Sequence, residues 1–322
     1  MSFSFTLEDL DQAAERVHGY MPPTPQYRWP LLATRTGADV WVKHENHTPI
    51  GAFKVRGGIN YMLRLKQEQP CVSGVISATR GNHGQSIGFA ARIVGMRAKI
   101  LVPHGNNPEK NDAMRALGVD LIEHGDDFQA AAEHAATLAL SEGYHMIRSF
   151  HPWLVEGVAS YGLELFRAIA DLDAVFVAVG MGSGICSLIA ARNALGLKTR
   201  IYGVVSENAP AYALSFREGG VVTTETADTL ADGVACRSPD EAALDLILKG
   251  AADIITVSDD DILAAIGHYL TDTHNLAEGA GAVPLAGLLQ RRDDFAGKRV
   301  ALIMSGGNAD RDLISRVLER EK

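Results

Sequence analysis

Cysteine is scarce in this sequence, and its few copies form no recognisable pattern. Cys71, Cys186 and Cys236 are far apart and make no CxxC pair. An odd number of isolated cysteines argues against a disulfide framework and favours small buried residues in a reducing compartment. The first residues are acidic and lack the basic-then-apolar order of an export signal. We therefore expect a cytoplasmic protein.

Positive charge and long apolar runs are also limited. Lys and Arg number 30 against 39 Asp and Glu, which gives a net charge of −9 over 322 residues. This balance argues against a surface for nucleic acid or anionic lipid, although a local basic pocket remains compatible with it. The longest uncharged stretch, residues 174–191, contains three glycines and two serines, which would leave backbone groups poorly shielded in a bilayer. We expect neither a nucleic-acid partner nor a membrane span.

Short apolar runs alternate with helix-like segments along the chain. The runs are residues 72–77, 98–102, 120–122, 174–179, 201–205 and 299–304, and the helix-like segments include 85–94, 108–117, 128–141 and 185–195. Continuous apolar strands that alternate with helices predict an α/β fold with parallel sheets covered on both faces. The length suggests about two domains.

Three of the predicted strands are followed by loops rich in glycine and small polar residues. These loops are residues 78–84, 180–184 and 305–308. Because ligands of open α/β sheets bind at the carboxyl ends of the strands, the loops predict a site for a ligand with phosphate or carboxylate groups.

The loop Gly180, Met181, Gly182, Ser183, Gly184 can direct backbone N–H groups toward an anion. A tight turn between strand and helix would explain the same residues. A dinucleotide site is another reading, since Glu207 lies near the place of a ribose-binding carboxylate, but Ile185 occupies the position of the third glycine. The pattern favours a phosphate over a nicotinamide cofactor.

Residues 44–58 form the most specific stretch, with Lys54 at an expected helix start. The helix dipole disfavours a positive charge there, which lowers the pKa of the lysine and favours a nucleophilic amine. The alternative is an ordinary solvated lysine. His44 and His47 do not make an HExxH pattern, and no third ligand accompanies them, so the histidines do not indicate a metal.

Taken together, these segments resemble the fold-type II pyridoxal-phosphate enzymes of the threonine and serine dehydratase (serine racemase-like) family. Residues 79–85, 180–184, 229–235, 278–282 and 305–308 follow the order of that family's motifs, and the resemblance spans about residues 16–312. It implies a tryptophan synthase β-like fold: two open, twisted, mostly parallel sheets flanked by helices, with the active site between domains. It further implies a large cofactor domain of residues 1–72 and 151–322, a small mobile domain of residues 73–150, and a homodimer.

The resemblance also implies roles for individual residues. Lys54 would join the cofactor aldehyde as a Schiff base and handle the Cα proton. Phe53 would lie against the pyridine ring, Asn82 would bind the cofactor hydroxyl and Ser305 would face the pyridine nitrogen. The phosphate would be held by the backbone of Gly180, Met181, Gly182, Ser183 and Gly184, and the substrate carboxylate by Thr79, Gly81, Asn82 and His83.

Arg80 departs from the family pattern, in which this position usually carries a small residue. Racemases use a serine there as an acid–base group, and an arginine cannot lose a proton in that role. We therefore expect dehydration without substantial racemisation. Arg80 either binds a substrate carboxylate, including the second one of 3-hydroxyaspartate, or points outward and pairs with an acidic neighbour.

The expected activity is elimination of water from a β-hydroxy-L-amino acid, such as threonine, serine, 3-hydroxyaspartate or 3-phenylserine, to give a 2-oxo acid and ammonia. A β-replacement synthase or racemase of the same fold is the alternative, and a nicotinamide-dependent oxidoreductase would leave Lys54 unexplained. A divalent cation is left open: Glu207 falls where some relatives place a ligand, but the nearby aspartate position holds Ala211 or Ala213.

Overall fold

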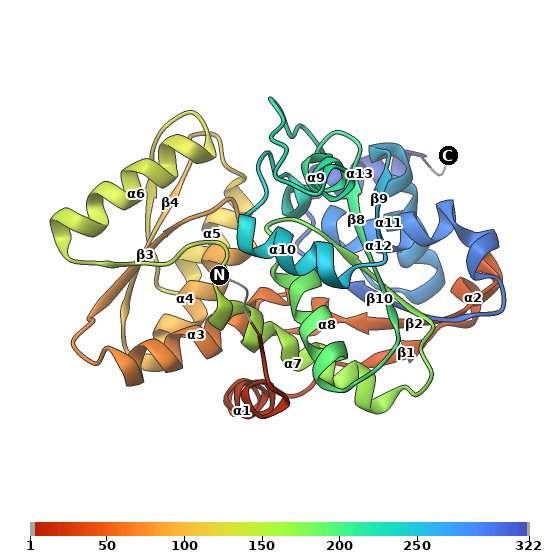
Figure 1. Ribbon diagram of the computed structural model, residues 1–322. Helices are drawn as coiled ribbons and strands as arrows, with labels where there is room; N and C mark the ends of the chain where they lie inside the picture. The colour runs from red at the N-terminus through yellow and green to blue at the C-terminus, as the bar shows by residue number, and fades with distance from the viewer. Residues whose placement is uncertain (1–3, 321–322) are drawn as a thin grey trace.

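The computed structural model describes residues 4–320, which form two lobes side by side, each built on its own sheet (Figure 1). The larger sheet has six strands in the order β1-β2-β10-β7-β8-β9. Only β1 runs antiparallel to its neighbour; the other pairings are parallel. Its strands are β1 (Gln26–Arg28), β2 (Asp39–His44), β7 (Ala174–Ala178), β8 (Arg200–Ser206), β9 (Asp253–Val257) and β10 (Arg299–Met304).

The smaller sheet has four parallel strands in the order β5-β4-β3-β6. Its strands are β3 (Gly74–Ala78), β4 (Arg97–Val102), β5 (Asp120–Glu123) and β6 (His145–Met146). The expected architecture of two mostly parallel sheets flanked by helices is confirmed.

Helices connect the strands and cover the sheets. They are α1 (Leu7–His18), α2 (Pro30–Thr36), α3 (Lys54–Glu68), α4 (Asn82–Val94), α5 (Pro108–Ala116), α6 (Phe128–Glu142), α7 (Pro152–Ala168), α8 (Ser183–Ala194), α9 (Ala211–Glu218), α10 (Glu241–Gly250), α11 (Asp259–Thr273), α12 (Gly279–Gln290) and α13 (Arg311–Arg320). Short 3-10 turns occur at η1 (Glu45–His47), η2 (Asp232–Val234) and η3 (Arg292–Phe295).

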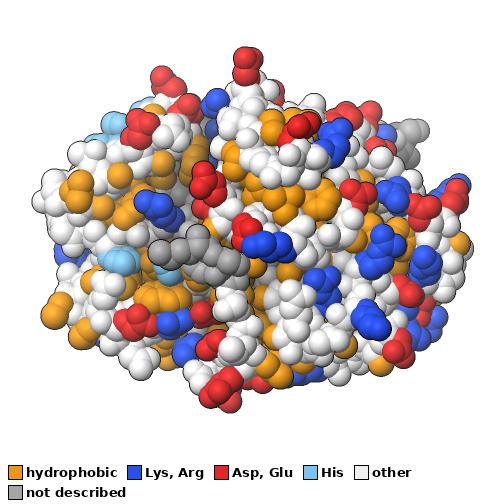
Figure 2. All heavy atoms as spheres, in the orientation of Figure 1, with side chains coloured by type: hydrophobic (Ala, Val, Ile, Leu, Met, Phe, Trp, Pro, Cys, Tyr) orange, Lys and Arg blue, Asp and Glu red, His pale blue; other side chains and the backbone are white. Residues whose placement is uncertain are grey.

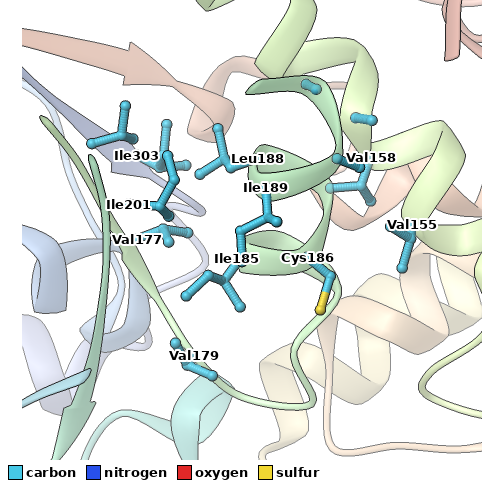
Figure 3. Packing of buried hydrophobic residues seen from close by; sticks show 14 of the residues in the cluster. Val155, Val158, Val177, Val179, Ile185, Cys186, Leu188, Ile189, Ile201 and Ile303 are labelled. Atoms are coloured by element: carbon cyan, nitrogen blue, oxygen red, sulfur yellow. The ribbon is translucent and has the colours of Figure 1, made fainter. Parts of the chain in front are cut away.

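The central strands of the large sheet bury both of their faces. Along β7, Val175 and Val177 belong to one apolar cluster, while Ala174 and Phe176 belong to the cluster on the opposite face. Figure 3 shows the first cluster, in which Ile185 and other apolar side chains of α8 pack toward the sheet. Fully burying such a side chain contributes about 1.5–3 kcal/mol each, so this packing holds α8 firmly at the end of β7.

Helix α3 packs against the core of the smaller lobe. Ile59, Met62 and Leu65 share an apolar cluster with Val75 of β3 and Ile100 of β4. The helix that begins at Lys54 therefore leads from β2 of the large sheet to β3 of the small sheet.

The six predicted strands all occur, β10 with the predicted ends and the other five with one or both ends shifted, whereas β1, β2, β6 and β9 had no prediction. Strand β2 mixes Asp39 and Lys43 with valines and a tryptophan, so its sequence does not form an apolar run. Lys43 is buried all the same, because ionic partners from other elements surround it. Apolar runs in the sequence therefore predict strands that are buried among apolar neighbours. They do not predict a strand such as β2, which is stabilised by ion pairs with distant residues.

The surface carries charged side chains of both signs. On the face in Figure 2, acidic and basic side chains are interspersed. Among the described residues, none of the helices has the length and apolar character that crossing a bilayer requires.

Candidate active site

Lys54 is the first residue of α3, and backbone contacts fix where that helix begins. Ala52 forms an isolated bridge with Gly306. The backbone N–H of Phe53 donates to the carbonyl oxygen of Ser305 at 2.9 Å. The predicted helix start is confirmed, and it lies beside the carboxyl end of β10.

The amine of Lys54 is enclosed and lacks a bonded partner within residues 4–320. Burial lowers its pKa, and the nearby carboxylate of Glu278 opposes this effect only in part. The Nζ atom lies 4.9 Å from the centre of the Phe53 ring. A lysine whose pKa is depressed by desolvation carries a larger share of neutral amine, which is the nucleophilic form.

The glycine loop joins β7 to α8, and its backbone is packed too tightly for side chains. Gly182 caps α8 with a φ of +95°, a region that favours glycine. A Cβ at Gly180 would lie only 2.1 Å from the carbonyl oxygen of Gly233. The loop therefore presents bare backbone at the N-terminus of a helix, which is a favourable place for an anion.

One pocket brings together all the residues predicted to contact the cofactor. Lys54 lines it from the first turn of α3 and Phe53 from the N-cap of that helix. Asn82 lines it from α4, Ser305 from the end of β10, and residues 180–184 from the glycine loop. Its other lining residues are Tyr161, Val177, Ala178, Gly233, Glu278, Ala280 and Ile303.

Asn82 is held by hydrogen bonds at both ends of its amide. Its Nδ2 donates to Oε1 of Glu278 at 2.7 Å. Its Oδ1 accepts from Nδ2 of Asn308 at 2.8 Å, and the same nitrogen lies 2.9 Å from the carbonyl oxygen of Ile50. The two bonds to Asn82 come from two distant segments, and they fix the orientation of its side chain.

Glu278 is a residue of this pocket that sequence reasoning did not single out. Burial raises its pKa, while Lys110 and the hydrogen bond from Asn82 act in the opposite direction. It is the N-cap residue of α12. The sequence feature that could have identified Glu278 is its place directly before the glycine-rich segment 279–281, where a carboxylate stabilises a helix N-terminus.

The loop between β3 and α4 carries the predicted substrate-binding residues. The N–H of Gly81 donates to Oγ1 of Thr79 at 3.1 Å. His83 is buried, and its Nε2 atom has no hydrogen-bond partner among the described residues. Burial, aided by the charge of Lys54, lowers the pKa of His83 to about 3. His83 is therefore a neutral imidazole at physiological pH.

Arg80 lies in the same loop with its side chain exposed. It forms no ion pair or hydrogen bond with any residue the structure describes. The acidic neighbour considered as its alternative partner is therefore not found within residues 4–320. Its guanidinium is available to a ligand.

Behind Lys54, a buried ionic network holds α3 in place. Arg56 donates to both carboxylate oxygens of Glu45, at 2.6 and 3.0 Å, and also to Glu164. Lys43 pairs with the same Glu164. Burial opposes ionisation of Glu164, but Arg56 and Lys43 outweigh it and lower its pKa to about 2. Because buried ion pairs are costly to break, the network fixes α3 two residues beyond Lys54.

Near Glu207, the two positions considered for an aspartate ligand, Ala211 and Ala213, carry no carboxylate. Ala211 and Ala213 are buried on α9. Among residues 4–320, no group of three His, Cys, Asp or Glu side chains is arranged to hold a metal ion.

Comparison with known proteins identifies the family. Residues 17–306 match the family model described as "Pyridoxal-phosphate dependent enzyme". The chain is 33% identical to an L-threonine ammonia-lyase of Thermotoga maritima, over 98% of this chain and 78% of that protein. It is 31% identical to an L-threo-3-hydroxyaspartate ammonia-lyase of a Pseudomonas species, over 97% of this chain and 98% of that protein.

A solved structure agrees with these relatives. The processed form of threonine deaminase isoform 2 from Solanum lycopersicum superposes with a TM-score of 0.89 at 30% identity. The superposition covers 99% of this chain and 95% of that one. The chain therefore belongs to the pyridoxal-phosphate dependent enzymes, with pyridoxal 5′-phosphate as its cofactor.

Proposed function

We propose that the protein is an ammonia-lyase that eliminates water from a β-hydroxy-L-amino acid and releases a 2-oxo acid and ammonia. The observation that carries the proposal is the enclosed amine of Lys54, with its lowered pKa, in one pocket with a bare glycine loop. The relatives named as ammonia-lyases of threonine and 3-hydroxyaspartate support the reaction class.

The residues present fit the cofactor. The loop 180–184 leaves no room for a Cβ at Gly180 and offers N–H groups at a helix start, which suits a phosphate. The hydroxyl residue Ser305 lines the pocket from the end of β10. When bound, pyridoxal 5′-phosphate supplies an aldehyde that captures amines and a conjugated ring that accepts electron density from Cα.

The chain's own groups would divide the work as follows. The neutral Nζ of Lys54 takes the proton from the substrate Cα. Asn82, fixed by Glu278 and Asn308, presents its amide to the cofactor hydroxyl. Ser305 offers a hydroxyl to the ring nitrogen, and a hydroxyl does not hold a proton there as a carboxylate would. A ring with less electron-withdrawing power favours prompt loss of the β-substituent over transamination.

The loop between β3 and α4, called the substrate loop below, would bind the carboxylate of the amino acid. Thr79, Gly81 and His83 lie at or beside the N-terminus of α4, where backbone N–H groups and the helix dipole favour an anion. Arg80, exposed and without an ionic partner among the described residues, would bind a second carboxylate in a substrate such as 3-hydroxyaspartate. Because its guanidinium does not release a proton, we propose dehydration without substantial racemisation.

A β-replacement synthase or a racemase of the same fold remains the alternative within the family. A nicotinamide-dependent oxidoreductase would not account for Lys54. The match to the pyridoxal-phosphate dependent enzymes favours pyridoxal 5′-phosphate over a nicotinamide cofactor.

Residues 73–150 are proposed to move as a small domain that closes over the site, against a large domain of residues 1–72 and 151–322. Contacts at the mouth support this: Lys110 of α5 pairs with Asp232, and Nδ2 of Asn107 donates to Asp310 at 2.7 Å. Closure would exclude water while the deprotonated substrate exists.

A cytoplasmic homodimer is proposed as its state in the cell. The cysteines, exposed Cys71 and buried Cys186 and Cys236, are all free, which suits a reducing compartment. Light scattering coupled to size exclusion tests the dimer.

Spectroscopy and product assays test the function. The purified protein should have a visible absorbance band that borohydride removes, and it should release ammonia and a 2-oxo acid in equal amounts from at least one of threonine, serine, 3-hydroxyaspartate and 3-phenylserine. A protein with the band that forms only D-amino acid, or that only exchanges the β-substituent, would be a racemase or a synthase instead.

A further inference from the structure

Tyr212 connects the glycine loop to two helices of the large lobe. It lies on α9 and is 1% exposed. Its hydroxyl donates to the carbonyl oxygen of Met181 at 3.1 Å. The hydroxyl oxygen of Tyr212 also accepts the backbone N–H of Asp240, the N-cap residue of α10, at 3.3 Å. Both hydrogen-bonding capacities of the hydroxyl are therefore used.

The bond to Met181 also orients the peptide that precedes α8. In a planar trans peptide, the carbonyl of Met181 and the N–H of Gly182 point in opposite directions. Met181 and Gly182 line the cofactor pocket, whereas Tyr212 does not. Holding the Met181 carbonyl on the Tyr212 side thus turns the Gly182 N–H toward the pocket. That N–H has no acceptor among the described residues.

The packing around Gly182 requires this arrangement. Its φ of +95° places it in the left-handed region. A Cβ at this position would lie 3.1 Å from the Tyr212 hydroxyl and 2.8 Å from the Cβ of Ala243 on α10. Tyr212 and α10 therefore support the outer side of the loop, opposite the pocket (Figure 1 shows α8, α9 and α10 in the same lobe).

We propose that Tyr212 is a positioning residue that holds the glycine loop in the conformation that binds the cofactor phosphate. The role rests on pyridoxal 5′-phosphate as the cofactor and does not depend on which amino acid is the substrate. It is exerted through the Met181 and Gly182 peptide, without contact between the tyrosine and the cofactor.

Tyr212→Phe tests the proposal, since it removes the hydroxyl and keeps the ring. We expect the dissociation constant of pyridoxal 5′-phosphate from the apoprotein to rise about tenfold, because the partly buried Met181 carbonyl and Asp240 N–H lose their partner. Pyridoxal, which lacks the phosphate, should bind within about twofold of its parent affinity. The two constants are measured by spectral titration of each apoprotein.

Tyr269→Phe is the matched control. Tyr269 is 0% exposed, but its hydroxyl has no hydrogen-bond partner among the described residues, and it lies on α11 away from the loop. Its removal should leave the affinities for both ligands at the parent values. The thermal midpoint of each apoprotein reports any general loss of stability.

Two results would overturn the role of Tyr212. One is parent-like affinity for pyridoxal 5′-phosphate in Tyr212→Phe; the other is an equal loss of affinity for pyridoxal, which would indicate general damage to the pocket. Failure of the parent protein to bind the phosphorylated ligand would instead contradict the cofactor assignment, and failure to act on amino acids would contradict only the proposed function.

Discussion

The glycine loop and the substrate loop have the same local architecture, but they offer different groups to a ligand. The first offers tightly packed backbone, and the second offers polar side chains. Each follows a parallel strand and leads into a helix, β7 into α8 and β3 into α4. In the first, Gly180 and Gly182 press against neighbouring backbone and side chains, and Tyr212 fixes the peptide between. In the second, Arg80 is exposed without an ionic partner, and the His83 Nε2 lacks an acceptor or donor within residues 4–320.

This difference indicates how the cofactor phosphate and the amino acid substrate would be recognised. In the proposed site, a phosphate that is the same in every catalytic cycle would be bound by backbone held at fixed positions, where added atoms cannot be accommodated. A substrate whose side chain varies among enzymes of one fold would be bound by polar side chains without other partners. Substitutions should therefore act on cofactor affinity at the first loop and on substrate selectivity at the second.

The largest effect is expected at Lys54, which lines the same pocket as the glycine loop. Lys54→Ala removes the amine that we propose takes the Cα proton, and we expect turnover to fall about a thousandfold or more. The protein should also lose the absorbance band that borohydride removes. Lys66→Ala, an exposed residue in the last turn of the same helix, should retain parent activity. Undiminished turnover by Lys54→Ala would contradict the mechanism.

At the glycine loop, Gly180→Ala should weaken cofactor binding about 10- to 100-fold. Its Cβ would lie 2.1 Å from the Gly233 carbonyl oxygen, so the backbone must shift away from the phosphate position. Equilibrium dialysis of the apoprotein with pyridoxal 5′-phosphate measures the change. Gly220→Ala is the control, because a Cβ there meets nothing within 4 Å. Equal affinities in the two variants would argue against a rigid loop.

At the substrate loop, Arg80→Ala should leave cofactor affinity unchanged and raise KM for 3-hydroxyaspartate about tenfold, as expected for loss of one partly exposed charge-assisted bond. KM for threonine should change far less, since threonine has no second carboxylate. Arg92→Ala, exposed about 15 Å away at the far end of α4, controls for the loss of positive charge. Equal KM changes for both substrates would assign Arg80 to the α-carboxylate.

The smallest effect concerns the dependence of stability on pH. His83 has a pKa of about 3 in the folded protein against an ordinary 6.5, so the unfolded chain binds a proton there that the folded chain does not. The free energy of unfolding should therefore fall as pH decreases from 6.5 toward 3, by up to about 1.4 kcal/mol per pH unit from this residue. His44, with a pKa of about 4, acts in the same direction.

His83→Gln should remove the first contribution and leave that of His44. Urea unfolding of the apoprotein between pH 7 and pH 5 measures the slope for each variant. An unchanged slope would mean that His83 takes up protons equally in the folded and unfolded states over this range.

Much of the architecture could be read from the sequence, because its information is local. Runs such as residues 174–179 and 300–304 are apolar throughout, as expected for strands buried on both faces. The strand β2 could not be read in this way. Its Lys43 is buried through a pairing with Glu164, which lies 121 residues away.

The cofactor-side residues were predicted from motifs, while their supports were not. Asn82 was assigned from its loop, but Glu278, which fixes its amide, lies 196 residues further along the chain. Likewise, the glycines of residues 180–184 indicate a ligand loop, whereas the residues next to Tyr212 in the sequence give no indication of its contact with Met181. Such contacts depend on where α9, α10 and α12 pack, and no periodicity encodes that.

By itself, the sequence determined the alternation of strands and helices, the lysine at a helix start, and the loops that follow the strands, since each depends on neighbouring residues and on the stereochemistry of glycine. Tertiary structure alone decided that the Lys54 amine is desolvated, that Asn82 is held at both ends, and that Arg80 is left without an ionic partner in the described chain. These properties arise from burial and from contacts between distant segments, which exist only once the two sheets are packed together.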